Sequence, residues 1–242
     1  MASSRIFSMI PGAITQEEDD PSTFVFRLST QLSSMNFFIT GTDTDSGKTF
    51  VTALLTRSLR RAGFDTVAMK PVSCGEPEDT LALQIAADSE LTLGEVTPVS
   101  YAAPLAPIEA ARLEGRAFDP AEVLPTFEHL HRTRRSLLVE GVGGWLVPLA
   151  ENYSGANLAK SMGFPVLLVV RNRLGALNHA LLTLESITAH GLTCTGIVLN
   201  NHPDDVHDLA PDGNRRLLPT LTKIPILFEI MPGQTELELA VA

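Results

Sequence analysis

Nine consecutive residues, Gly41-Thr42-Asp43-Thr44-Asp45-Ser46-Gly47-Lys48-Thr49, have the types and spacing of a phosphate-binding loop. They follow the apolar segment Phe37-Phe38-Ile39-Thr40 and precede a helical pattern. A glycine-rich turn between a strand and a helix directs backbone N–H groups and the positive end of the helix dipole at one point, which favours a phosphate. Lys48 then reaches the terminal phosphates, and the Thr49 hydroxyl coordinates Mg²⁺. The segment therefore predicts a nucleoside triphosphate site.

The spacing of this loop differs from the usual pattern. Five residues separate Gly41 from Gly47, one more than the common template has. The order of strand, loop and helix is kept, so we expect phosphate binding to be kept as well. The alternative, an incidental glycine turn with a solvated lysine, does not explain why Lys48 and Thr49 stand where a helix begins.

Strand-like and helix-like segments alternate from Met35 onward. Continuous apolar runs, typical of strands buried on both faces, cover 36–41, 66–70, 136–140, 165–170, 195–200 and 225–230. Helical patterns occupy 48–62, 79–88, 107–114, 120–133, 155–162, 176–190 and roughly 213–222. The alternation predicts a single α/β domain with a mostly parallel, P-loop NTPase-like sheet and helices on both faces.

Ligands of such sheets bind beyond the carboxyl ends of the strands. Lys70, Glu140 and Asn200 each close an apolar run and so belong to the same rim as loop 41–47. Pro71 keeps the chain extended after Lys70, and we interpret this lysine as anion-binding rather than solvated. Asn200 has a donor and an acceptor that can read a purine edge, although asparagine also favours turns.

Two acidic residues are candidate metal ligands. Glu140 precedes Gly141-Val142-Gly143-Gly144-Trp145, and an acid at this strand end is the usual second metal anchor of a P-loop protein. The alternative is an acid that ends the strand by chance. Asp79 stands at the start of a helical pattern, where it is either an N-cap or a metal ligand, and the sequence leaves both open.

The composition of this chain of 242 residues limits which kinds of partner it can bind. Its 28 acidic and 18 basic residues give a net charge of −10, which argues against nucleic acid. Two cysteines, Cys74 and Cys194, supply neither a metal-binding set nor a disulfide framework, and they fit a reducing cytoplasm. No apolar stretch approaches the ~20 residues that span a bilayer, so no membrane is expected.

Residues 1–34 differ from the rest. They carry the acidic block Glu17-Glu18-Asp19-Asp20 and little periodicity, and they lack the pattern of a signal peptide. Met35 stands just before the first strand. We expect 1–34 to be a disordered extension, or the product of a misplaced start codon, and 35–242 to be the P-loop domain that binds the nucleoside triphosphate.

The motifs taken in order resemble those of dethiobiotin synthetase, the ATP-dependent carboxylase of the biotin pathway. The shared set is Gly-Thr-Asp-Thr-x-x-Gly-Lys-Thr, Lys-Pro-Val, Asp79, Val-Glu-Gly-x-Gly-Gly-Trp and Gly-x-x-Asn-His, between Met35 and about Glu229. The resemblance implies a Mg²⁺-dependent cyclo-ligase that converts 7,8-diaminononanoate, CO₂ and ATP to dethiobiotin, ADP and phosphate. It also implies a homodimer in which the substrate tail reaches the partner subunit.

The resemblance further implies roles for residues of this chain. Lys70, Lys48 and Thr44 would be catalytic, and Thr49, Asp79 and Glu140 would bind the metal. The nucleotide would be held by Gly41, Thr42, Asp43, Asp45, Ser46, Gly47, Lys48, Thr49, Glu140 and Asn200. The substrate would meet Thr44, Lys70, Cys74, Gly143 and Asn178. Many family members have serine where Cys74 stands, and the tail after Glu229 is shorter than theirs.

Two other functions are compatible with a nucleotide-binding half of this kind. A cobyrinate-type amidating synthetase would need a glutamine-hydrolysing domain with a nucleophilic cysteine, for which 242 residues leave no room. A switch ATPase of the ParA/MinD kind would carry a second lysine early in the loop, where this chain has Thr42 and Asp43.

Overall fold

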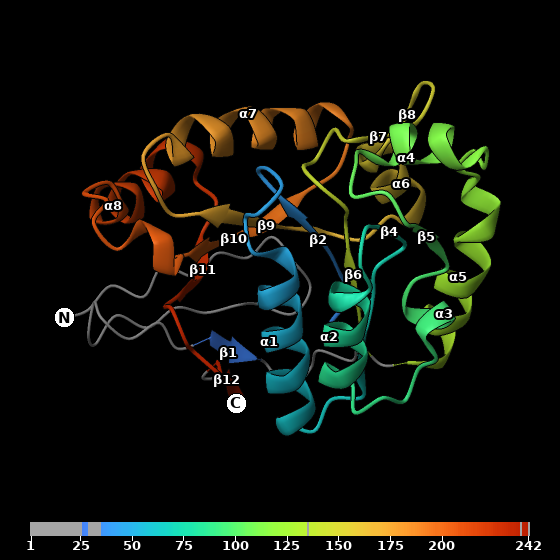
Figure 1. Cartoon of the computed structure of the whole chain (residues 1–242). Coiled ribbons are helices and arrows are strands. Elements are labelled where there is room, and N and C mark those ends of the chain that lie inside the picture. The colour runs from blue at the N-terminus through green and yellow to red at the C-terminus, as the bar shows by residue number, and fades with distance from the viewer. Residues whose placement is uncertain (1–25, 29–34, 135, 238, 242) are drawn as a thin grey trace.

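The structure, a computed structural model, describes residues 26–28, 35–134, 136–237 and 239–241. Its centre is a six-stranded parallel sheet with the order β11-β10-β9-β2-β6-β3 (Figure 1). The strands are β2 (Phe37–Gly41), β3 (Thr66–Met69), β6 (Ser136–Glu140), β9 (Val166–Arg171), β10 (Cys194–Asn200) and β11 (Ile226–Ile230). They are the six strands that the apolar runs predict, with ends that differ by at most one residue.

Helices cover both faces of the sheet, as predicted, and α1 and α2 lie side by side on one of them (Figure 1). The long helices are α1 (Lys48–Arg61), α2 (Glu78–Ala86), α4 (Pro107–Glu114), α5 (Leu124–Thr133), α6 (Gly155–Met162), α7 (Ala176–Ala189) and α8 (Pro211–Thr222). Gly115 and Gly163 end α4 and α6 in the left-handed conformation, as their positions in the sequence indicate.

One predicted helix is divided. The pattern at 120–133 forms a short 3-10 turn, Pro120–Glu122, and then α5. Pro125 stands in the first turn of α5, where it has no N–H to donate and its ring would clash with the carbonyl of Ala121 in a continuous helix. The break therefore follows from proline.

Several short elements were not predicted. They are α3 (Leu93–Val96) and the strand pairs β4 (Val72–Cys74) with β5 (Val99–Tyr101), β7 (Pro148–Ala150) with β8 (Tyr153–Ser154), and β1 (Phe26–Leu28) with β12 (Leu239–Val241). Two- and three-residue strands are too short to show a period. Apart from β1, the predicted disordered extension at 1–34 lies outside the described residues.

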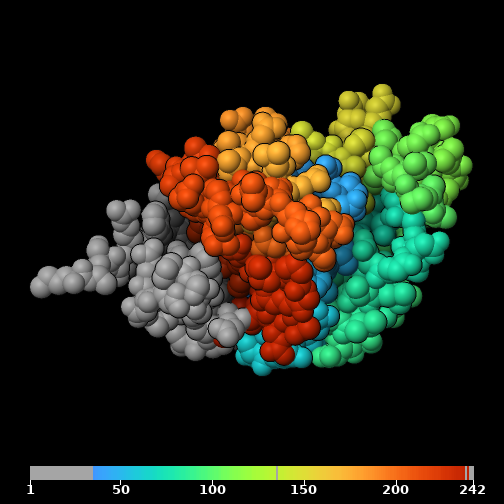
Figure 2. Space-filling view, turned by 60° about the vertical axis from the view of Figure 1, so that its left-hand side comes forward, coloured from blue at the N-terminus to red at the C-terminus, as the bar shows by residue number. Residues whose placement is uncertain are grey.

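The strand order explains where a ligand can bind. The chain runs from β2 to β3, returns to β6 on one side of β2, and then crosses to β9 on the other side. A loop that follows a strand at such a change of direction opens into a crevice at the carboxyl edge of the sheet. The loop after β2 lies at this change of direction. Figure 2 shows that the blue part of the chain, to which this loop belongs, reaches the surface between the middle and the C-terminal parts of the chain.

Candidate active site

The loop between β2 and α1 is folded tightly on itself. A Cβ on Gly41 would lie 2.1 Å from Ser46 Oγ, so only glycine allows the loop to close there. Gly47 has a φ of +89° and is the N-cap residue of α1. The ammonium of Lys48 turns back over the loop and donates to the carbonyl oxygen of Asp43 across 3.1 Å. The loop is thus a closed turn directly before α1, at the place where the sequence predicts that a phosphate binds.

Asn200, at the end of β10, holds the loop from behind. Its Nδ2 donates to the carbonyl oxygen of Ser46 at 3.0 Å, and its side chain is buried. The sequence predicts that the Asn200 side chain contacts the edge of a purine base, and this contact stays a prediction. The amide donor contacts the loop itself.

Four side chains from four elements meet beside the loop. Lys70 Nζ lies 2.8 Å from Glu140 Oε1 and also forms an ion pair with Asp79. Thr49 Oγ1 donates to the same Glu140 Oε1 across 2.7 Å. Lys70 is 4% exposed and Glu140 0% exposed, so both charges are removed from water. The structure thus brings Thr49, Lys70, Asp79 and Glu140 together on one rim.

The two lysines of the site have opposite electrostatic surroundings. Burial lowers the pKa of Lys48, and the nearby carboxylate of Glu140 offsets that effect only in part. Burial would also lower the pKa of Lys70, but the charges of Glu140 and Asp79 outweigh it and the pKa is raised. Lys70 is consequently a fixed cation, whereas Lys48 is a charge without a carboxylate partner among the described residues.

Asp79 is not the N-cap of its helix. α2 begins at Glu78 with Pro77 in the cap position, and no side chain caps it. Asp79 stands in the first turn and directs its carboxylate to Lys70. Burial would raise the pKa of Asp79, but the charge of Lys70 and the hydrogen bond from its ammonium hold it below its usual value. Of the two roles that the sequence left open, capping is therefore wrong.

The other predicted residues lie around this centre. Asp43, Thr44 and Asp45 are exposed on the loop, and Thr42 is half-buried. Cys74 ends β4 and is half-buried, and burial raises the pKa of its thiol to about 11.

In the glycine-rich segment after β6, Gly144 rather than Gly143 is next to the loop. A Cβ on Gly144 would lie 3.5 Å from the Cα of Asp43, whereas one on Gly143 would meet only Val147. Asn178 is exposed on α7 and does not line the pocket next to the loop. Its predicted role depends on a second subunit.

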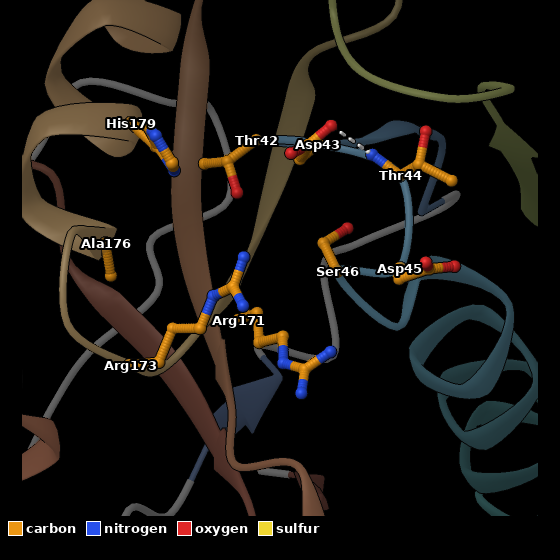
Figure 3. Close-up of a pocket in the computed structure, with 9 residues that line it drawn as sticks. All are labelled: Thr42, Asp43, Thr44, Asp45, Ser46, Arg171, Arg173, Ala176 and His179. Carbon is orange, nitrogen blue, oxygen red and sulfur yellow. Dashed lines mark hydrogen bonds between the residues drawn. The ribbon is translucent and has the colours of Figure 1, made fainter. Parts of the chain in front are cut away.

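That pocket has a wall that the sequence did not predict. Arg171, Arg173, Ala176 and His179 line the pocket together with the loop residues 42–46, and the Arg173 side chain extends into the space between α7 and the loop (Figure 3). Arg171 is fixed by Asp205, with Nε 2.5 Å from Oδ2. The signal was present, because Arg171 ends β9 at the same rim as the predicted residues.

The donors present fit a divalent cation that binds with a nucleotide. Glu140 Oε2 is buried and has no hydrogen-bond partner among the described residues. Mg²⁺ commonly takes one or two carboxylates and fills its remaining positions with water and phosphate oxygens. Within the described ranges no three His, Cys, Asp or Glu side chains are placed so that they could hold a metal by themselves.

The parallel sheet, the loop at its point of reversal and the lysine at the start of α1 define a P-loop nucleoside-triphosphate-binding protein. Comparison with known proteins narrows this class. The AAA domain family matches residues 35–238. ATP-dependent dethiobiotin synthetase of Akkermansia muciniphila is 42% identical over 206 residues, which cover 85% of this chain and 96% of that protein.

The enzyme of the same name from Aromatoleum aromaticum is 40% identical over 199 residues, covering 79% of this chain and 88% of the relative. The chain belongs to the dethiobiotin synthetase family and is an enzyme.

Solved structures agree on the fold alone. The cell division ATPase MinD of Pyrococcus furiosus superposes with a TM-score of 0.53 at 19% identity, covering 82% of this chain and 83% of MinD. FtsY of Elizabethkingia anophelis in complex with GDP gives a TM-score of 0.55 at 14% identity, with 92% of this chain and 62% of FtsY covered. In the part of the chain that the structure describes, no helix is long and apolar enough to cross a membrane.

Proposed function

We propose that this enzyme carboxylates 7,8-diaminononanoate and closes the ureido ring of dethiobiotin at the expense of ATP. The observation that carries the proposal is the continuous set of contacts from Thr49 through Glu140 and Lys70 to Asp79, beside the phosphate loop. These residue types occupy the positions that the family resemblance assigns to metal and transferred group. The relatives that share the sequence are named for this activity.

The reaction proceeds in three steps. One amine of the substrate adds to CO₂, forms a C–N bond and loses a proton, which gives a carbamate. A carbamate oxygen then attacks the γ-phosphorus of ATP, and the bond from that phosphorus to the ADP oxygen breaks. The second amine attacks the carbonyl carbon of the resulting mixed anhydride, forms the second C–N bond and loses a proton, and the bond from that carbon to the phosphate oxygen breaks, which releases phosphate.

The chain contributes positioning and positive charge to these steps. The N–H groups of loop 41–47 and the ammonium of Lys48 hold the phosphates. Lys70 stands at the rim where the carbamate and the transferred phosphoryl group meet, and Thr44 projects from the loop. Arg171 and Arg173 add positive charge on the opposite wall of the pocket.

Thr49, Asp79 and Glu140 would hold Mg²⁺, which neutralises the charge that develops on the phosphate oxygens. The buried, unpartnered Oε2 of Glu140 and the contact from Thr49 support this assignment. Asn200 keeps the loop in the shape that the phosphates require, and its remaining carbonyl group would meet the adenine.

The same proposal covers the substrate tail. Asn178 is exposed at the start of α7, where backbone N–H groups favour a carboxylate. We propose that this helix of one subunit receives the tail of a diamine bound in its partner, so that the active enzyme is a homodimer. Cys74 and Gly143 would contact the substrate in the first subunit, and the enzyme would act in the cytoplasm.

The test is product formation. The full chain is incubated with ATP, Mg²⁺, bicarbonate and the diamine, and dethiobiotin is measured by mass spectrometry beside ADP. We expect one ADP for each dethiobiotin and almost no ADP when the diamine is left out. If ADP is released at the same rate with and without the diamine, the proposal is contradicted and a switch ATPase is favoured. Switch ATPases have a lysine early in the loop, where this chain has Thr42 and Asp43.

A further inference from the structure

The ammonium of Lys70 lies between the two carboxylates of the proposed metal site. It contacts Glu140 Oε1 at 2.8 Å and pairs with Asp79 Oδ2. Both contacts are to carboxylates that the proposed function assigns to the metal. Thr49 contacts the same carboxylate oxygen, since its hydroxyl donates to Glu140 Oε1.

Burial makes this arrangement strong. The Lys70 side chain is 5% exposed and that of Glu140 0% exposed, so neither charge has water as an alternative partner. Removing one member of a buried pair leaves the other charge uncompensated, which is costly. A bare cation that displaced Lys70 would therefore have to strand a buried ammonium.

The charges of the whole centre lead to the same conclusion. Two ammonium groups, Lys48 and Lys70, are balanced by the two carboxylates of Asp79 and Glu140. A divalent cation alone would add two positive charges to this balanced set. A nucleotide brings the negative charge of its phosphates, which gives Lys48 and Lys70 new partners and frees the carboxylate oxygens.

We infer that Lys70 is an internal counter-ion that keeps free divalent metal out of the nucleotide-free site, so that metal enters only together with the nucleotide. The inference rests on the proposed function in taking Asp79, Glu140 and Thr49 as the metal ligands. It adds a second role for Lys70, which leaves the carboxylates for the transferred group when the metal–nucleotide complex binds. Lys70 thereby couples the arrival of metal to the assembly of the site.

The experiment measures Mn²⁺ binding to the full chain in the absence of nucleotide, diamine and bicarbonate, with free Mn²⁺ quantified by electron paramagnetic resonance. We expect weak binding by the wild type. Lys70→Met, which keeps the length and removes the charge, should bind Mn²⁺ at least about tenfold more tightly, equivalent to about 1.4 kcal/mol. Adding Glu140→Gln to Lys70→Met should abolish the gain.

Three controls make the result specific. Lys160→Met removes one positive charge from an exposed position on α6 and should leave Mn²⁺ affinity within about twofold of wild type. Lys70→Arg keeps the cation and should keep the metal out. Lys70→Gln replaces Lys70→Met if circular dichroism shows that the methionine variant does not fold.

The inference is overturned if the folded Lys70 variant binds Mn²⁺ no more tightly than wild type, or if the nucleotide-free wild type already binds it tightly. It is also overturned by a structure with Mg²⁺ and a non-hydrolysable ATP analogue in which Lys70 still contacts both carboxylates. None of these measurements uses turnover. A protein that fails to make dethiobiotin can still show the metal effect, and an active enzyme can lack it, so the two proposals fail separately.

Discussion

The side-chain amide of Asn200 donates a hydrogen bond to the carbonyl oxygen of Ser46 across 3.0 Å, although the two residues are 154 positions apart in the chain. The contact joins the end of β10 to the phosphate loop in the interior of the protein, where both residues are buried. A backbone carbonyl without a partner in such a place is costly. Asn200 therefore stabilises the loop in the conformation that receives phosphate.

Asn200→Ala should weaken nucleotide binding and lower stability. The substitution leaves the Ser46 carbonyl unpaired, which costs about 1–3 kcal/mol. If the loop relaxes to avoid this cost, the nucleotide Kd should rise roughly tenfold or more. Asn200→Asp should be worse, because a carboxylate cannot donate and would repel the carbonyl oxygen of Ser46. Asn201→Ala is the control, since the Asn201 amide donates to Glu229 and to Ile230 and not to the loop. Equal nucleotide affinities by calorimetry in the Asn200→Ala variant and the wild type would contradict this role.

Gly47→Ala should abolish nucleotide binding. Its Cβ would lie 2.0 Å from Asn200 Nδ2, and a φ of +89° strains any residue other than glycine. Gly213→Ala is the matched control, because Gly213 lies in α8 with nothing within 4 Å of its Cβ position. That change should stabilise the protein by about 0.5–1 kcal/mol in urea unfolding. Normal nucleotide affinity in the Gly47 variant would show that the loop is not held as described.

The two buried lysines should respond oppositely to removal in the nucleotide-free protein. Lys48→Met should raise the free energy of unfolding by up to about 1 kcal/mol, because burial of an ammonium without a carboxylate partner is unfavourable. The change is measured as a higher urea midpoint. Lys70→Met should lower the free energy of unfolding by about 3 kcal/mol, because two carboxylates lose their cation. A lower midpoint for Lys48→Met would contradict the assigned surroundings of Lys48.

The pH dependence of these effects has a definite sign. The pKa of Lys48 is lowered from 10.5, so its destabilising effect is full at neutral pH and is relieved as the pH rises toward 10.5. The pKa of Lys70 is raised from 10.5, so its stabilising effect is full below pH 10.5 and is lost only above it. Between pH 7 and pH 10 the advantage of Lys48→Met should shrink, while the deficit of Lys70→Met should persist.

Kinetics should separate the same residues. Lys48→Ala should lower turnover by orders of magnitude and also weaken ATP binding, since it removes a phosphate contact. Lys70→Ala should lower kcat far more than it changes the Kd of ATP, because Lys70 faces the group that is transferred. Calorimetry with a non-hydrolysable analogue measures the binding part. If Lys70→Ala loses only nucleotide affinity, its placement on the transferred group is wrong.

Neither cysteine should react readily in the folded protein. Burial raises the pKa of the Cys74 thiol to about 11 and that of Cys194 to about 12. The reactive thiolate of Cys74 is thus about a hundredfold scarcer at pH 8 than for an ordinary cysteine. Iodoacetamide labelling should be slow at pH 8, accelerate toward pH 11, and become fast at both positions in guanidinium. Rapid labelling of Cys74 in a Cys194→Ser variant would contradict its burial.

Much of the fold was determined by the sequence alone. Six apolar runs gave the six strands because a strand buried on both faces shows no alternation of apolar and polar residues, as in residues 67–69 of β3 and 137–139 of β6. Glycine and proline set helix ends such as Gly115 for local steric reasons, and they account for the break before α5. The loop after β2 was located in the same way, from a pattern that neighbouring residues complete among themselves.

The order of the strands decided the rest. Sequence indicated that Lys70, Asp79 and Glu140 belong to one rim, but only the placement of β6 between β2 and β3 brings Glu140 within 2.8 Å of Lys70. Local patterns cannot encode distances between segments that are separated by 70 residues, because those distances depend on which strands the whole chain pairs.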